Sequence, residues 1–456
     1  MTHGVSMPSH ETVVQVQPRH AAYDLARLSA VLGLDPPQVP RQQSPAIWVE
    51  GQLHHEATAW LEVRHATLRN DKTVTTNAQR LKAWIQFLRG RDETVHTATE
   101  EDYRAYEVAC RFPTPDDHPN LTPVSDGWWR NTKSVIKQFH EWLRDTHGTP
   151  TPFSVVDKHG PNGRTTSGIE DAGRLRQPRP GALPLLPAAI DRIVAAAGEP
   201  TPEGRERGQG LRDQALIQWL VATGMRITPS TNLTHYEVPP ASGGDFDWLH
   251  TPAAINKYRR AVRSGAFAAR LFPVRAYLAG DRAVLAAHGV RHQPLAPLHI
   301  KRADHRWVTY VTGDGEVVRR QWNEIDEEHR HRLVDVDGSS PLLWLTQTGG
   351  PMSTRTGQHV VKEAIKRAAA ADASIPTDAS PHSLRHTYAT FMAVMWIAAD
   401  PDLYRVGEHR IQFGLTDAVR HVQRQLGHTD ERTTGIYTGH VADLLGLHPD
   451  RLKGKR

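Results

Sequence analysis

Two pairs of residues near the C-terminus have side-chain types and spacings that suit chemistry on a phosphodiester. The run SPHSLRH places His382 three residues before Arg385, and the run LGHTDERTTGIY places His428 nine residues before Tyr437. A phenol, a guanidinium and two imidazoles are groups that the cutting of a phosphate ester can use without a metal. An earlier arginine, Arg226 in the run ATGMRI, would complete a phosphate clamp.

Cutting a DNA phosphodiester requires four roles to be filled. These are a nucleophile, donors for the non-bridging oxygens, an acid for the leaving hydroxyl, and a base or hydrogen-bond partner for the nucleophile. Tyr437 offers a phenol that can form a covalent phosphotyrosine, and the planar guanidinium groups of Arg226 and Arg385 suit the clamp. The SP dipeptide predicts a helix start that places His382 and Arg385 near backbone N–H groups that favour an anion. Alone, each residue would more often be an ordinary surface or core side chain; the grouping favours a site.

The elements that must position these residues begin with a helical region over residues 46–150. Apolar side chains recur there with helical spacing at Leu81, Trp84, Ile85 and Leu88. The same pattern returns between residues 135 and 143, and TATE at residues 97–100 resembles a helix capping box. We expect a compact bundle of about four helices over this region.

Composition indicates the domain boundaries on either side of this bundle. Residues 1–45 contain proline and polar clusters and are expected to form a flexible leader. Residues 151–183 are rich in Pro, Gly, Thr and charge, which is typical of an interdomain linker. A second domain over residues 184–456 then begins with a helix at Pro187, because proline suits the first helical turn.

The second domain is expected to combine helices with a small antiparallel sheet. Short alternating segments at 233–238, 247–250 and 268–274 predict strands, and GDG near the centre of residues 305–318 predicts a hairpin. Helical spacing dominates again from Ser353 onward. The chain as a whole is therefore predicted to be mainly α, with a helical domain followed by a mixed α+β catalytic domain and a C-terminal tail.

Composition narrows the class of protein. The chain has 456 residues, too many for one ordinary core, and its 38% hydrophobic content and mean hydropathy of −0.53 predict a soluble, cytoplasmic protein without a membrane span. Its single cysteine, Cys110, excludes an internal disulfide framework and a cysteine-cluster zinc site, and we expect no metal or cofactor. The net charge of +5 and the pI of about 9.3 favour a polyanionic partner, although an arginine-rich composition alone would give the same values.

Together the motifs resemble those of the tyrosine recombinases, also called phage-type integrases. TGMRI is similar to the first arginine box of that family, HSLRHTYAT to its histidine–arginine box, and LGH through Tyr437 to its final histidine and nucleophile. PLLWL at residues 341–345, followed by two glycines and a helical pattern, is also similar. The resemblance covers roughly residues 184–445. Residues 50–150 match the core-binding domain of the family by position and character only.

The resemblance implies a mechanism for the matched positions. Tyr437 would attack the scissile phosphate and give a 3′-phosphotyrosyl link and a free 5′-hydroxyl. Arg226, Arg385 and His428 would stabilise charge on the phosphoryl oxygens, and His382 would assist proton transfer at the nucleophile.

The family also uses a lysine from a hairpin after the first arginine box as the acid for the leaving hydroxyl. Lys257, in the run INKYRR between predicted strands, is the first candidate, and Lys301 is the second. A solvated surface lysine is the competing interpretation of Lys257.

Two features depart from the family pattern. Pro229 stands where an acidic residue commonly follows the first arginine, which raises a question about the local backbone. Residues 397–416 lengthen the stretch between Arg385 and His428 and are expected to be an insertion. His386 is expected to be a structural neighbour of the site.

The function that the resemblance implies is site-specific DNA recombination, in the integration, excision or resolution of a mobile element. The implied partners are double-stranded DNA, clamped between the two domains, three further copies of the chain in a homo-tetramer on two DNA sites, and accessory DNA-bending proteins. Two alternatives remain at this stage. One is strand relaxation of the type IB topoisomerase kind, and the other is a catalytically inactive DNA-binding accessory protein.

Overall fold

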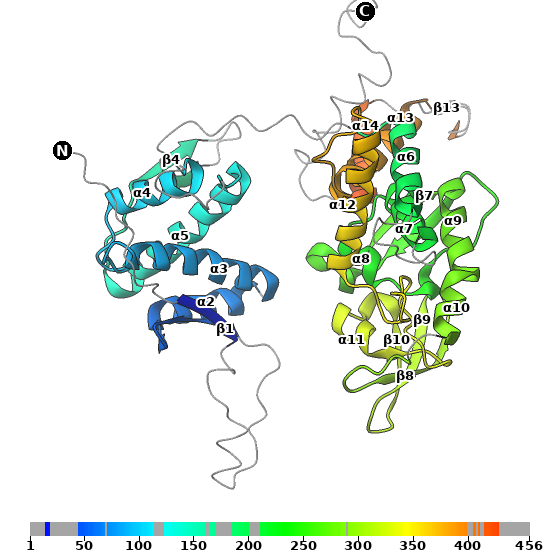
Figure 1. Cartoon of the computed structure of the whole chain (residues 1–456), viewed down its shortest axis with the longest axis horizontal. Helices are drawn as coiled ribbons and strands as arrows, with labels where there is room; N and C mark the ends of the chain where they lie inside the picture. The colour runs from blue at the N-terminus through cyan, green and yellow to red at the C-terminus, as the bar shows by residue number, and fades with distance from the viewer. Residues whose placement is uncertain are drawn as a thin grey trace, which may run out of the picture. The chain divides into compact units, whose positions relative to one another are not determined.

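A computed structural model of the chain divides into two compact units, Met1–Gln177 and Pro178–Arg456 (Figure 1). It describes residues 14–18, 44–68, 71–113, 123–159, 165–169, 184–199, 210–288, 291–398, 405–406, 409–410 and 415–427.

The described residues of the first unit form four helices, a three-stranded sheet and a two-stranded hairpin. The helices are α2 (His55–Leu68), α3 (Asp71–Arg89), α4 (Glu100–Arg111) and α5 (Asp126–His147). The antiparallel sheet joins β1 (Val14–Pro18), β2 (Pro45–Val49) and β3 (Gln52–Leu53) in that order. The predicted stripe on α3 is buried, with Leu81, Trp84 and Leu88 all inaccessible to solvent, so the helical character expected for this region is confirmed.

Three local details of this unit differ from expectation. The capping box of α4 lies two residues later than predicted, with Thr99 as the N-cap and its backbone N–H donating to the carboxylate of Asp102. β1 lies within the predicted flexible leader, and the Val-Gln-Val-Gln alternation explains it, because the side chain of Val14 is buried and that of Gln15 is exposed. β4 (Val155–His159) and β5 (Thr165–Ile169) form an antiparallel hairpin within the predicted linker, where Ile169 joins the core of the unit.

The second unit is organised around α7 (Gly210–Thr223). This helix is buried along most of its length and contacts α6 (Pro187–Gly198), α9 (Ala268–Ala279), α12 (Thr354–Ala371) and α13 (Pro381–Ala398). The remaining helices are α8 (Ile227–Asn232), α10 (Asp281–His288), α11 (Glu327–Arg332) and α14 (Leu415–Leu426), with short 3₁₀ turns η3 (His235–Glu237), η4 (Ala253–Ile255), η5 (Lys257–Arg259) and η6 (Trp322–Glu324). The predicted helix start at Pro187 is confirmed.

Among the described residues of this unit, the β-structure consists of three small sheets. β6 (Phe246–Thr251) and β7 (Val262–Phe267) form an antiparallel hairpin, and β12 (Arg405–Val406) pairs with β13 (His409–Arg410) inside the predicted insertion. The third sheet has the order β10-β9-β8-β11, with β8 (Leu298–Ala303), β9 (Trp307–Val311), β10 (Val317–Gln321) and β11 (Leu333–Val334). β11 runs parallel to β8, so this sheet is not wholly antiparallel, although the predicted hairpin at 305–318 is confirmed.

Two of the predicted strands are wrong. Residues 268–274 begin α9, where Leu271, Val274 and Tyr277 recur every three residues and pack toward α7. Residues 233–238 form η3, with a single bridge between Thr234 and Leu342. The mainly α character with small sheets is confirmed.

No described helix is both long and apolar enough to cross a bilayer.

Candidate active site

Arg226 is placed by the end of the central helix α7. After Thr223 the chain turns through Gly224, whose φ of +61° lies in the left-handed region that favours glycine. Arg226 is then the N-cap of α8 and is partly exposed, while Met225 and Ile227 on either side are buried. The buried neighbours fix the backbone and leave the guanidinium within reach of solvent.

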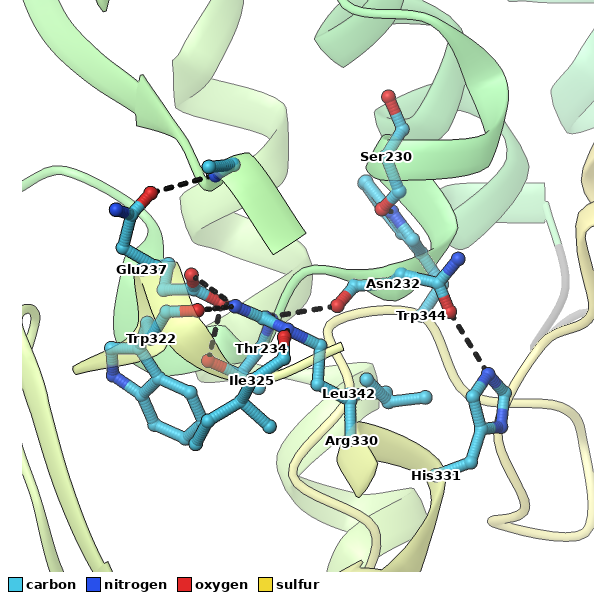
Figure 2. A network of polar contacts seen from close by, with 12 residues as sticks. Ser230, Asn232, Thr234, Glu237, Trp322, Ile325, Arg330, His331, Leu342 and Trp344 are labelled. Carbon is cyan, nitrogen blue, oxygen red and sulfur yellow. Dashed lines mark hydrogen bonds and ion pairs between the residues drawn. The ribbon is translucent and has the colours of Figure 1, made fainter. Parts of the chain in front are cut away.

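The far end of α8 is held by a buried polar network (Figure 2). A six-residue helix is too short to be stable alone, and its last carbonyls have no partners within the helix. Arg330 Nη1 donates to the Asn232 carbonyl at 3.0 Å, and Trp344 Nε1 donates to the Ser230 carbonyl at 3.0 Å. Arg330 is fully buried and also donates to both carboxylate oxygens of Glu237, at 2.6 and 3.1 Å. Side chains from α11 and from the segment before α12 therefore support the helix that starts at Arg226.

Pro229 causes no strain in this helix. It is the third residue after the N-cap, and the first intrahelical bond is donated by the next residue, Ser230, to the Arg226 carbonyl at 3.1 Å. The N–H that proline lacks is thus one that would have no partner within the helix. The question that the sequence raised about the backbone is answered by this position in the first turn.

His382 and Arg385 lie in the first two turns of α13, which begins at Pro381 as predicted. Arg385 is buried, with 4% of its surface exposed. Its Nη1 donates to the Gly224 carbonyl and its Nη2 to the Leu426 carbonyl, both at 2.6 Å. Gly224 lies two residues before Arg226, and Leu426 lies two residues before His428. One guanidinium therefore ties together the three motifs that the sequence singled out.

Tyr388, one turn further along α13, strengthens the same junction. Its hydroxyl lies 2.6 Å from the Gly265 carbonyl of β7 and 2.8 Å from Gln425 Oε1 of α14. Its ring fills the space beside Gly224, where an added Cβ would lie 2.2 Å from a ring carbon. No sequence pattern indicates this role of Tyr388, because a tyrosine inside an apolar helix has the pattern of an ordinary core residue.

His382 is the candidate proton-transfer group, and its surroundings favour the neutral imidazole. Protein atoms packed around it disfavour the imidazolium and lower its pKa from 6.5, and the positive charges of Arg385 and Arg226 lower the pKa further. His382 nevertheless remains exposed to solvent, as a group that meets a substrate must be. His386 is buried beneath it, with its ring edge-on at a centroid distance of 4.4 Å.

The lowered pKa predicts the titration of His382. Between its own pKa and 6.5 the folded chain keeps His382 neutral whereas the unfolded chain protonates it, so this group makes folding less stable as the pH falls through that window. An NMR titration, assigned with His382→Gln, should give a midpoint below 6.5. Arg226→Gln should raise the midpoint, because one positive charge is removed. A midpoint at or above 6.5 in the wild type would contradict this description.

The two candidate lysines lie in different sheets. Lys257 is exposed in η5, in the connection between β6 and β7, where its N–H donates to Asn256 Oδ1 at 2.9 Å. The hairpin that carries it packs against α14 and is bonded to Tyr388 through Gly265. Lys301 is exposed on β8, whose sheet packs over a separate core around Trp322 and Leu333. The hairpin of Lys257 is therefore joined directly to the Arg385 junction.

His428 and Tyr437 lie outside the described residues, which end this region at Gly427. Gly427 has a φ of +64°, and an added Cβ would lie 2.6 Å from Cγ2 of Val262 on β7. Only glycine suits both the conformation and the contact, so α14 ends at a defined place against the hairpin of Lys257. Among the described residues no group of three His, Cys, Asp or Glu side chains could hold a metal ion.

Comparison with known proteins finds similarity to tyrosine recombinases. Tyrosine recombinase XerD of Corynebacterium glutamicum is 36% identical over 117 residues, which cover 25% of this chain and 30% of that protein. Tyrosine recombinase XerC of Bacillus licheniformis is 25% identical over 254 residues, covering 54% and 57%. Over these stretches the chain is similar to tyrosine recombinases.

The match to these tyrosine recombinases is partial. Tyrosine recombinase XerD of Mycobacterium leprae is 24% identical over 287 residues, or 62% of this chain and 66% of that protein. The chain thus spans between 30 and 66% of the lengths of these three relatives. No protein-family model matches it.

Solved structures of tyrosine recombinases are also similar to this chain. XerH bound to its difH substrate in a post-cleavage complex is 13% identical, covers 86% of this chain and 82% of that one, and gives a TM-score of 0.46. A lambda integrase dimer bound to a COC′ core site is 12% identical, covers 83% and 76%, and gives 0.42. At these scores the structural likeness supports no conclusion about this chain.

Proposed function

We propose that this chain is a site-specific DNA recombinase that cuts and rejoins DNA through a 3′-phosphotyrosyl intermediate. The observation that carries the proposal is the junction at Arg385, whose two bonds to the Gly224 and Leu426 carbonyls bring the three motifs to one place. The positive charges of Arg385 and Arg226 both act on His382. The relationship to the tyrosine recombinases supports the reaction class.

In the proposed reaction the oxygen of Tyr437 bonds to the scissile phosphorus and the bond to the 5′-oxygen breaks. Arg226, Arg385 and His428 stabilise the charge that develops on the non-bridging oxygens. The neutral His382 accepts or shares the proton of the tyrosine, for which its lowered pKa suits it at neutral pH. Lys257 donates a proton to the leaving 5′-oxygen.

The proposed partners are double-stranded DNA and three further copies of the chain, as a tetramer on two DNA sites, assisted by DNA-bending proteins. The first unit is proposed to supply the additional DNA-binding domain. Most of the affinity is expected to come from phosphate contacts, which depend strongly on salt.

Covalent capture on nicked DNA tests the proposal. A pool of nicked duplexes with randomised sequence should give a protein–DNA adduct on a denaturing gel, because the short 5′-hydroxyl fragment diffuses away and the reaction cannot reverse. Tyr437→Phe should give no adduct, since the attacking oxygen is gone. Tyr310→Phe, which removes a hydroxyl on β9, is the matched control and should leave the yield unchanged.

The proposal fails if the wild type gives no adduct, or if Tyr437→Phe still gives one. Once a cleaved sequence has been recovered from the adduct, two-site substrates separate the remaining alternatives. Formation of Holliday junctions would indicate recombination, whereas relaxation of supercoils without junctions would indicate a topoisomerase.

A further inference from the structure

The strands β8, β9 and β10 have an unusual charge distribution. The three strands contain four charged residues of the Lys, Arg, Asp and Glu types, and all four are basic: Lys301, Arg302, Arg319 and Arg320. All four are exposed, and within the described part of the chain none of them forms an ion pair. Mixed charges are the rule on ordinary surfaces, so a surface of one sign indicates a charged partner.

The strand register places part of this charge on one face. Arg302 of β8 and Arg319 of β10 both lie opposite Thr309 of the central strand β9. Residues paired in this way project from the same side of a sheet, so Arg302, Thr309 and Arg319 form a row across three strands. Val308 and Tyr310 alternate with Thr309 and are buried on the other side, against Trp322 and Leu333.

An aromatic side chain orders the arginines on this face. The guanidinium of Arg319 lies 4.5 Å from the ring centroid of Trp307, and that of Arg306 lies 5.7 Å from it. Stacking of this kind holds a guanidinium in place without neutralising it. Two nearby acidic groups are in turns and have local partners: Asp304 accepts from the N–H groups of Arg306 and Trp307, and Asp314 from the Thr312 hydroxyl.

We propose that Arg302, Arg306 and Arg319, together with Lys301, form a second binding surface for the phosphate backbone of duplex DNA, apart from the Arg385 junction. In the second unit, β8 to β10 lie at the opposite end from α13 and α14 (Figure 1). The surface would therefore contact DNA beyond the scissile phosphate. Arginines that present N–H groups outward from a rigid sheet match the spacing and charge of a phosphate backbone. The choice of duplex DNA as the ligand rests on the proposed function. In this inference Lys301 binds the phosphate backbone and is not the acid for the leaving hydroxyl.

The salt dependence of DNA binding tests the surface. For the full chain on a 40-bp duplex of arbitrary sequence, each lost phosphate contact should reduce the slope of log K against log salt by about 0.9. Arg302→Gln with Arg319→Gln should therefore reduce the slope by about 1.8 and weaken binding about 60-fold at 0.1 M salt. Lys362→Gln with Lys366→Gln, which removes two exposed charges from α12, is the matched control and should change the slope far less.

Several outcomes would overturn the inference. The first is an unchanged salt slope in the sheet variant, and the second is an equal loss of slope in the α12 variant. The third is a sheet variant that binds polyglutamate more weakly than the wild type but binds DNA equally well. Near-ultraviolet circular dichroism checks that both variants fold. Adduct formation at saturating DNA should be retained in the sheet variant, because neither arginine belongs to the proposed catalytic group. If the wild type forms no adduct but the sheet variant still has the reduced salt slope, the proposed function is wrong and the DNA-binding surface is retained.

Discussion

Arg226→Ala and Arg385→Ala are each expected to slow covalent DNA cleavage by two to three orders of magnitude. Each removes one cationic donor from the proposed phosphate clamp, and the loss of one such donor typically costs about 3–4 kcal/mol of transition-state stabilisation. Single-turnover rates of adduct formation on a nicked substrate measure this directly. Losses below about tenfold in both variants, which is only ~1.4 kcal/mol, would contradict the clamp.

The two arginine variants should differ in stability, because their environments differ. Arg385 is buried and bonded to two backbone carbonyls, and hydrogen bonds from a charged donor contribute roughly 1.5–3 kcal/mol each. Arg385→Ala should therefore lower the free energy of unfolding by about 3 kcal/mol or more. Arg226 is partly exposed at a helix N-cap, and its replacement should change stability by less than about 0.5 kcal/mol. Urea unfolding of both variants measures the free energy of unfolding and so separates the loss of a structural contact from the loss of a catalytic donor.

Lys257→Ala is expected to slow cleavage by 10²- to 10⁴-fold, about 3–5 kcal/mol, because the leaving 5′-oxygen loses its acid. A substrate in which sulfur replaces that bridging oxygen should restore the rate, since a thiolate is a far weaker base than an alkoxide and departs without a proton. Rescue of this kind identifies the acid and not merely a structural residue. The comparison of the two substrates therefore matters more than the loss itself.

Lys301→Ala is the matched control for this experiment. Lys301 lies on β8, in a different sheet from the hairpin that is bonded to Tyr388, so at saturating DNA its loss should leave the cleavage step intact on both substrates. Rescue by sulfur in Lys301→Ala and not in Lys257→Ala would reverse the assignment. It would also contradict the binding role inferred for Lys301.

Local sequence patterns predicted the parts of this protein that local forces control. The helix starts at Pro187 and Pro381 follow from the fixed φ of proline, and the buried stripe of α3 follows from the 3.6-residue period. Patterns shorter than an element were less reliable. Residues 268–274 look like a strand, and only the continuation to Tyr277 reveals the helical spacing that packs α9 toward α7.

Residue types and spacing by themselves determined which chemistry the chain can carry, because reactivity belongs to the side chains of Arg226, His382 and Arg385. Only the tertiary structure decided how the motifs meet. The bonds of Arg385 reach backbone carbonyls 161 and 41 residues away, and any residue supplies a carbonyl, so such contacts leave no trace in the sequence. The same holds for the fit of Gly224 beside Tyr388 and of Gly427 beside Val262, which depends on space that exists only after the helices have packed.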